Sequence, residues 1–261
     1  MIIRDGLISL LDEVLFIKDP LVSYDAYHPR IAMHYSHTYR ELDYETKYHL
    51  DQLYIDFYYH RHEIFWKNEA MKKLPALIEA SNMLICGEDL GMVPENVPEV
   101  MKQLNILSLE IQRMPKNPNI EFAHPNDAPY LSVCTTSTHD MSTIRGWWEE
   151  NREKTQRFYH NMLGHNGNAP FFAEPWICKE IINQHLYSPA MWTIFPIQDL
   201  ISIDGNLRWD ETDKERINVP SDEKNQWKYR MILSMEELLG ADEFNNLLRE
   251  MITRSGRNSD I

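Results

Sequence analysis

The feature that most constrains the fold is a unit that recurs about four times, in which a strand-like apolar run ends in polar residues and leads into a helix. The runs occupy residues 83–86, 107–112, 130–136 and 191–197. A short apolar run without polar alternation is typical of a strand buried on both faces of a parallel sheet. Strands that alternate with helices indicate βαβ units. We therefore expect an α/β protein with a parallel sheet.

Helical patterns fill most of the remaining chain. Apolar and aromatic side chains recur at helical spacing over residues 42–74 and predict a long helix. Pro75 is expected to kink this helix or to open a new short helix over residues 75–81. Two amphipathic stretches, at about 234–239 and 241–253, predict helices near the C-terminus.

Composition excludes several classes of protein. The net charge of −14 argues against a nucleic-acid partner, since such binding depends on Lys and Arg neutralising phosphates. No run of eighteen apolar residues is present, so we expect no membrane-spanning helix. The three cysteines are odd in number and match no zinc spacing, which indicates a reducing compartment; we expect the cytoplasm.

Acidic residues follow two of the strand-like runs. Glu88 closes the first run, and the third ends in His139 and Asp140. In α/β barrels the catalytic side chains sit at the C-terminal ends of the strands, so two such carboxylates would point into one mouth. A polar residue at a single strand end is usually structural. A pair suits glycoside chemistry, which needs a proton donor and negative charge near a developing oxocarbenium ion.

Several motifs occur in the order of a known family. They are KLPAL at 73–77, ICGEDLGMVP at 85–94, IQRMP at 111–115, STHDMST at 137–143, RGWWEE at 145–150, PIQD at 196–199 and ERINVP at 215–220. Over about residues 60–235 the sequence resembles the 4-α-glucanotransferases, the amylomaltase and disproportionating-enzyme family. The Trp147-Trp148 pair and WKYR at 227–230 look most like the type-2 branch.

The resemblance implies a (β/α)₈ barrel with insertions and a retaining transfer of α-1,4-glucan segments between sugar chains. The family's acid/base glutamate falls on Glu88 and its transition-state-stabilising aspartate on Asp140, with the sugar-binding histidine on His139. α-1,4-Glucans and maltooligosaccharides are the implied partners. No cofactor is expected, because carboxylates suffice for acid/base and covalent steps.

The family's third carboxylate, an Asp nucleophile in an Arg-x-Asp-His-type motif, has no counterpart before Glu88. Asp25 lacks the preceding Arg and strand, and Asp56 lies in a helical pattern, so neither is assigned. We expect a C-terminal part, about strands five to eight, of a (β/α)₈ barrel with helical insertions. Residues 1–62 would be an insert region and the helix preceding the fifth strand, and residues 63–261 the C-terminal half of the barrel with C-terminal helices. Nine glycines and few strand runs also suit part of a larger protein.

Without the nucleophile, the isolated chain is expected to be inactive or nearly so. A half barrel also exposes sheet edges and an apolar face, so self-association is expected. Two alternatives stay open. One is a retaining α-glucan hydrolase, in which water attacks the intermediate, and the other is a non-catalytic module that binds glucan at the same strand ends.

Further residues are candidates for substrate binding. Asp89 could orient Glu88 or accept backbone donors, and Arg113 could bind sugar, although an ion pair is its simpler role. Trp147 could stack on sugar or belong to the core, whereas Asn218 and Trp227 could each be structural or part of a subsite. No metal site is predicted, because the histidines of residues 28–62 lack an added carboxylate or Cys at a known ligand spacing.

Overall fold

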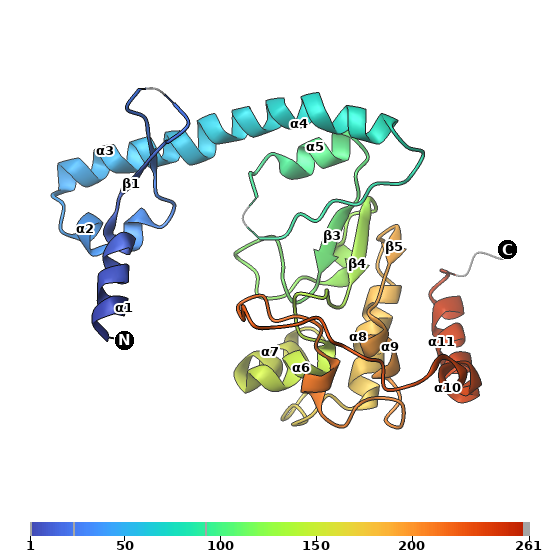
Figure 1. Cartoon of the computed structure of the whole chain (residues 1–261). Helices are drawn as coiled ribbons and strands as arrows, with labels where there is room; N and C mark the ends of the chain where they lie inside the picture. The colour runs from blue at the N-terminus through green and yellow to red at the C-terminus, as the bar shows by residue number, and fades with distance from the viewer. Residues whose placement is uncertain (1, 23, 92, 258–261) are drawn as a thin grey trace. The chain divides into compact units, whose positions relative to one another are not determined.

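A computed structural model describes residues 2–22, 24–91 and 93–257 (Figure 1). The chain forms two compact units. Unit 1 comprises Met1–Asn82 and Met92–Val100, and unit 2 comprises Met83–Gly91 and Met101–Ile261. The sequence analysis divides the chain by its expected place in a barrel, into an insert region over residues 1–62 and a half barrel over residues 63–261. The compact units do not test that division, which stays a prediction.

Unit 1 is mainly helical. Its elements are α1 (Ile2–Ser9), η1 (Leu10–Glu13), β1 (Phe16–Lys18), β2 (Tyr27–Pro29), η2 (Met33–Tyr35), α2 (His37–Arg40), α3 (Tyr44–Ile55), the π-helical η3 (Asp56–Arg61) and α4 (His62–Glu79). Strands β1 and β2 pair antiparallel. Helix α3 begins where the Asp43 side chain accepts a hydrogen bond from the Thr46 backbone N–H at 2.9 Å.

The long helix predicted over residues 42–74 is present as α3, η3 and α4 in succession (Figure 1). The expectation that Pro75 opens a new helix is wrong, because α4 continues through Pro75 to Glu79. Proline removes one donor from the helix, and the ladder resumes after it, with the Ala80 N–H donating to the Ala76 carbonyl at 3.2 Å.

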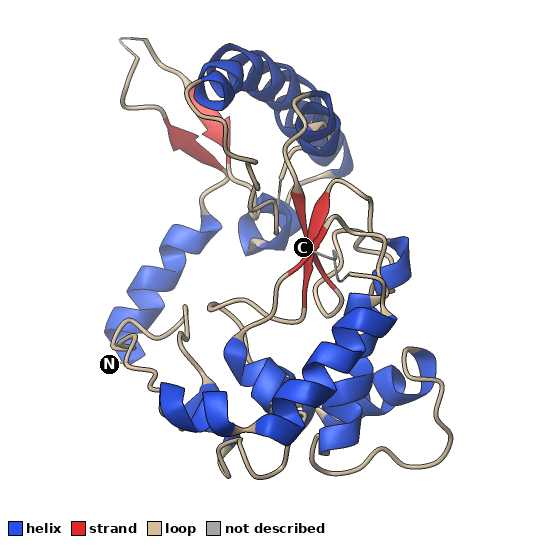
Figure 2. Ribbon diagram, turned by 90° about the vertical axis from the view of Figure 1, so that its right-hand side faces the viewer, coloured by secondary structure: helices blue, strands red, loops and turns tan. Residues whose placement is uncertain are grey.

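Unit 2 contains a parallel sheet in the order β3 (Ser108–Ile111), β4 (Ser132–Thr135), β5 (Trp192–Thr193) (Figure 2). The run at residues 83–86 adds one parallel bridge between Cys86 and Leu107. The predicted parallel sheet is therefore confirmed. Among the described residues this sheet does not close, so a half barrel is not shown by it and stays a prediction.

Further helical segments lie within residues 93–257. They are α5 (Val97–Gln103), η4 (Pro125–Asp127), α6 (Ile144–Glu150), α7 (Arg152–Asn161), α8 (Pro175–Leu186), α9 (Ile197–Ile201), η5 (Thr212–Glu215), α10 (Met235–Gly240) and α11 (Asp242–Arg254). The predicted C-terminal helices are confirmed as α10 and α11. Within residues 2–22, 24–91 and 93–257, no helix combines the length and the apolar character that crossing a bilayer requires.

An aromatic cluster forms the centre of the unit 2 core. Trp148 and Phe158 are fully buried, and Phe158 meets the rings of Phe122 and Trp147 nearly edge-on, each at a centroid distance of 5.0 Å. Edge-to-face aromatic pairs add to the hydrophobic gain of burial. Because Trp147 and Trp148 belong to α6, this core anchors the helix into which the loop after β4 leads.

His185 is a buried titratable group of the same core. Its Nδ1–H donates to the Ile181 carbonyl at 2.8 Å, and Nε2 has no hydrogen-bond partner among the described residues. Burial lowers the pKa of His185 from 6.5 to about 4, since desolvation disfavours the imidazolium.

We predict that His185 makes unit 2 sensitive to acid. The unfolded chain, with its higher histidine pKa, binds the proton first; the stabilisation is therefore complete above pH 6.5 and is lost as the pH falls towards 4. This group alone should lower the free energy of unfolding by about 2 kcal/mol between pH 7 and pH 5. His185→Gln should flatten that dependence in urea unfolding followed by tryptophan fluorescence, whereas the exposed His160→Gln should not. Parallel pH profiles for wild type and His185→Gln would contradict the prediction.

Candidate functional site

The loop that follows β4 presents the strand-end acid that the sequence singled out. Asp140 Oδ1 accepts a hydrogen bond from Asn218 Nδ2 at 2.6 Å, and its Oδ2 lies 3.2 Å from His139 Nε2. Asn218 Oδ1 in turn accepts a hydrogen bond from Asn225 Nδ2 at 2.7 Å. The fold thus brings three predicted site residues together, although Asp140 and Asn218 are 78 residues apart in the sequence.

Trp227 completes this group. Its ring lies 4.8 Å from the His139 ring, centroid to centroid, and 60% of the residue is exposed. The side chains of His139 and Asp140 are about half exposed, at 53% and 52%. A carboxylate, an imidazole and a flat indole therefore face solvent together, with the half-buried Asn218 amide bonded to the carboxylate. This arrangement suits a neutral ligand with hydroxyl groups and apolar faces. The sequence left open whether Trp227 is structural or part of a subsite.

A buried arginine supports the loop from within. Arg113 Nη2 donates to the Thr136 carbonyl at 2.8 Å, to Ser137 Oγ at 2.6 Å and to the Ser142 carbonyl at 2.9 Å. Burial lowers the pKa of Arg113 to about 10, while the carboxylates of Asp199 and Glu150 oppose that shift, so the guanidinium stays charged at neutral pH. This one cation thereby fixes both ends of the loop over residues 136–143.

Asp199, at the start of α9, is the matching buried anion. It is fully buried and accepts hydrogen bonds from Thr136 Oγ1 at 2.6 Å, Ser137 Oγ at 2.7 Å and the Ile144 backbone N–H at 2.8 Å. Sequence reasoning missed this role. The only signal was the PIQD motif after the fourth strand-like run.

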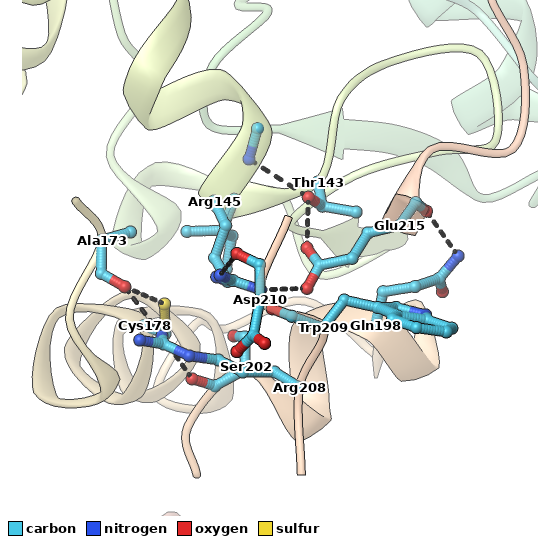
Figure 3. Close-up of polar contacts among 12 residues, drawn as sticks. Thr143, Arg145, Ala173, Cys178, Gln198, Ser202, Arg208, Trp209, Asp210 and Glu215 are labelled. Carbon is cyan, nitrogen blue, oxygen red and sulfur yellow. Dashed lines mark hydrogen bonds and ion pairs between the residues drawn. The ribbon is translucent and has the colours of Figure 1, made fainter. Parts of the chain in front are cut away.

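A second buried pair, Arg145 and Glu215, holds the start of the segment that leads to Asn218. Figure 3 shows the contacts of this pair. Arg145 forms an ion pair with Glu215 and donates to the Trp209 carbonyl at 2.7 Å; Thr143 Oγ1 donates to Glu215 at 3.0 Å. Burial raises the pKa of Glu215, and the Arg145 guanidinium opposes that rise. The carboxylate is thus costly to desolvate and depends on its partners.

Arg216 links this pair to the exposed group. Its Nη1 donates to Ser142 Oγ at 2.6 Å, and its Nε donates to the Asn218 carbonyl at 3.0 Å. The orientation of Asn218 towards Asp140 therefore follows from hydrogen bonds on both sides of the contact.

Glu88 follows the bridge at Cys86 and is exposed, with its Oε1 accepting a hydrogen bond from the Leu90 N–H at 3.2 Å. The next residue, Asp89, is buried, and its two oxygens accept from the Leu109 N–H at 2.9 Å and from Lys116 Nζ at 2.7 Å. Asp89 thereby ties the chain after Glu88 to β3. Because the bridge, β3 and β4 run parallel, Glu88 and Asp140 both follow strand ends at the same edge of the sheet.

Three residues predicted to bind substrate are buried. Asp89, Arg113 and Trp147 are 4%, 6% and 8% exposed, and the Arg113 guanidinium lies 5.1 Å from the centroid of the Trp147 ring. Their observed contacts are with the protein itself. Direct contact with substrate stays a prediction for these three residues, whereas the exposed Glu88, His139 and Asp140 lie open to solvent.

The two buried cysteines are not poised for chemistry. Burial raises the pKa of Cys134 to about 11 and that of Cys178 to about 12, so both thiols stay protonated at neutral pH. In the part of the chain that the structure describes, no three His, Cys, Asp or Glu side chains are gathered as they would be around a metal ion.

Catalytic side chains of α/β-barrel enzymes sit at the C-terminal ends of the strands, and glycoside chemistry uses a pair of carboxylates. Residues 33–234 match the 4-alpha-glucanotransferase family, glycoside hydrolase family 77. The chain belongs to this family.

Relatives agree with this assignment. The chain is 38% identical to 4-alpha-glucanotransferase DPE2 of Oryza sativa subsp. japonica over 255 residues, which cover 98% of this chain and 27% of the rice protein. It is 31% identical to the 4-alpha-glucanotransferase of Chlamydia caviae over 188 residues, 69% of this chain and 34% of that protein. The chain thus spans about a third or less of the length of these relatives.

A solved structure shares the fold. The amylomaltase from Streptococcus agalactiae in complex with acarbose matches 71% of this chain and 34% of its own, with a TM-score of 0.54 and 20% identity. At that identity the likeness concerns the fold alone.

We predict that Asp199 is the anchor of the loop that carries His139 and Asp140. Asp199→Ala leaves three buried donors unpaired and should lower the free energy of unfolding by about 3 kcal/mol. It should also speed amide hydrogen exchange in residues 136–144, measured by mass spectrometry. Asp199→Asn, which keeps an acceptor, should lose less, and the exposed Glu223→Ala should be near neutral. Unchanged exchange in residues 136–144 of Asp199→Ala would contradict the prediction.

Proposed function

We propose that this chain supplies the acid/base and sugar-binding side chains for retaining transfer of α-1,4-glucan segments between maltooligosaccharides or glucans. The observation that carries the proposal is the exposed group of Asp140, His139 and Trp227, which contacts the half-buried Asn218 and lies next to a loop held by buried charges. The family membership supports it, since the relatives are 4-alpha-glucanotransferases.

Each exposed residue takes a role that its chemistry allows. Glu88 protonates the oxygen of the glycosidic bond that breaks and later removes a proton from the acceptor hydroxyl. Asp140 accepts hydrogen bonds from ring hydroxyls, and its negative charge stabilises the oxocarbenium-like transition state more than the substrate. His139 donates to a hydroxyl, and the Trp227 face packs against a sugar ring. Asn218 orients the Asp140 carboxylate.

The buried residues act as positioning groups. Arg113 and Trp147 hold the loop over residues 136–143, and Asp89 holds the chain after Glu88. Placement matters because an error of about 1 Å in a reacting group can cost about a hundredfold in rate.

The nucleophile belongs, in this proposal, to a part of the enzyme outside these 261 residues. Retention requires a second carboxyl group about 5–5.5 Å from the acid/base. No Arg-x-Asp-His motif precedes Glu88, and the chain matches only 27% and 34% of the length of its rice and chlamydial relatives. Residues 63–261 would then form strands five to eight of the barrel, preceded by the insert region.

The 261-residue chain should bind maltoheptaose without converting it. We call the surface formed by Glu88, His139, Asp140 and Trp227 the rim. Trp227→Ala should weaken binding at the rim about fivefold or more, because the exposed ring supplies an apolar face to the sugar. Trp176→Ala, which also removes a partly exposed indole, is the matched control. Isothermal titration measures the affinity, and product chromatography measures disproportionation. Turnover by the chain alone at the rate of complete family members would overturn the proposed location of the nucleophile.

Glu88 should be essential in a longer protein that contains these residues together with a nucleophile segment. Glu88→Gln should lower kcat about 10²–10⁴-fold, the usual contribution of general acid/base catalysis, while maltooligosaccharide affinity is kept. The exposed Glu236→Gln, in α10, controls for loss of charge. Unchanged turnover in Glu88→Gln would favour a non-catalytic glucan-binding module, and release of free sugar without transfer products in the unsubstituted protein would favour a hydrolase.

A further inference from the structure

Unit 1 contains a cavity that the proposed reaction does not use. Its volume is about 330 Å³, within the range of roughly 300–1,000 Å³ that is usual for small-molecule sites. Its lining includes Tyr54, Tyr58, Tyr59, His62, Glu63 and Glu95. All of them lie in unit 1, whereas the rim residues Glu88, His139 and Asp140 belong to unit 2.

The aromatic wall of this cavity is held in place by its own hydroxyl groups. Tyr54 donates to the Ile31 carbonyl at 3.0 Å, and Tyr58 donates to the Pro29 carbonyl at 2.6 Å. Burial raises the pKa of both phenols, so both remain donors at neutral pH. With the hydroxyls engaged, the rings are fixed, and a ligand would meet their faces.

Neighbouring rings form an aromatic wall of tilted faces. Tyr54 and Tyr58 lie 4.7 Å apart between centroids with their planes at 48°, and Tyr58 and His62 lie 6.4 Å apart with their planes at 25°. Tyr59, beside them, is 59% exposed. An exposed ring face such as that of Tyr59 can pack against the apolar face of a sugar ring.

The backbone that carries Tyr58 and Tyr59 is unusual. Both belong to η3, a six-residue π-helical segment between α3 and α4. π-Helical turns are rare and occur frequently at functional sites.

Acidic groups select the kind of ligand. Glu63 Oε1 accepts a hydrogen bond from the Glu95 backbone N–H at 2.8 Å, and the Glu63 carbonyl accepts one from Asn96 Nδ2 at 2.8 Å. The Glu63 carboxylate is therefore fixed beside the rings, with the Glu95 side chain on the same wall. Two carboxylates disfavour phosphates and other anions, whereas they accept hydrogen bonds from hydroxyl groups.

We propose that this cavity is a second binding site for α-1,4-glucan chains, separate from the rim of unit 2. One sugar ring packs against Tyr58 and Tyr59, and its hydroxyls donate to the carboxylates of Glu63 and Glu95. The ligand class rests on the proposed function, because a glucan-transferring enzyme meets long chains that can occupy two sites. A rigid aromatic wall with carboxylates would also suit an organic cation, which the experiment tests.

Hydrogen exchange with mass spectrometry on the 261-residue chain can locate the binding. Maltoheptaose at ten times its dissociation constant for this site should slow exchange in residues 54–63 and 93–96 about tenfold. Tyr59→Ala and Glu63→Gln should each weaken this protection about fivefold, while Tyr44→Ala, an exposed tyrosine of α3 outside the cavity, should not. Each variant is compared with and without sugar, so a change in its own baseline does not enter the result.

Hydrogen exchange distinguishes binding at the two sites. Binding at the rim is tested by protection of residues 136–144 and 216–230 and by the loss of that protection in Trp227→Ala. The second site is supported by protection of residues 54–63 that survives Trp227→Ala. Rim protection without any slowing in residues 54–63 would overturn this inference and leave the proposed function standing. Protection of residues 54–63 by cellohexaose or choline, equal to that by maltoheptaose, would overturn the assignment to α-1,4-glucans.

Discussion

The rim of unit 2 depends on two buried charges, Arg113 and Asp199, beneath the loop after β4. Removing either charge from water is costly, and the cost is offset only by a full set of hydrogen bonds. Arg113 donates to the Thr136 and Ser142 carbonyls, and Asp199 accepts from Thr136 and Ser137 side chains and from the Ile144 N–H. A loop conformation that lost these hydrogen bonds would leave the charges unsatisfied, which favours the conformation observed.

Charged residues of unit 2 differ in burial according to their role. Those that hold the structure, such as Arg113, Asp199 and Glu215, are buried. Those proposed to act on sugar, Glu88 and Asp140, remain exposed. An exposed carboxylate keeps its hydration until a ligand displaces water, whereas a buried one would already have exchanged its water for protein donors, as Asp89 has done.

Aromatic residues play different parts in the two units. In unit 2 they pack edge-to-face around Phe158 and exclude water. In unit 1 the tyrosines of α3 and η3 are tied to backbone carbonyls and line a cavity. The sequence pattern predicts helix in both cases, because periodicity reports which positions are apolar and not what covers them.

The sequence by itself determined the parallel strands, the helices near the C-terminus and the acids at strand ends, because these depend on local hydrophobic patterns and short motifs. The motifs that contain Glu88, His139 and Asp140 also indicated the family of the chain. Only the tertiary structure decided that Asn218 contacts Asp140, that Asp199 anchors the loop, and that Asp89 and Arg113 are buried. Those outcomes rest on contacts between segments that lie 20 to 78 residues apart, and no local pattern encodes which distant donor will satisfy a buried charge.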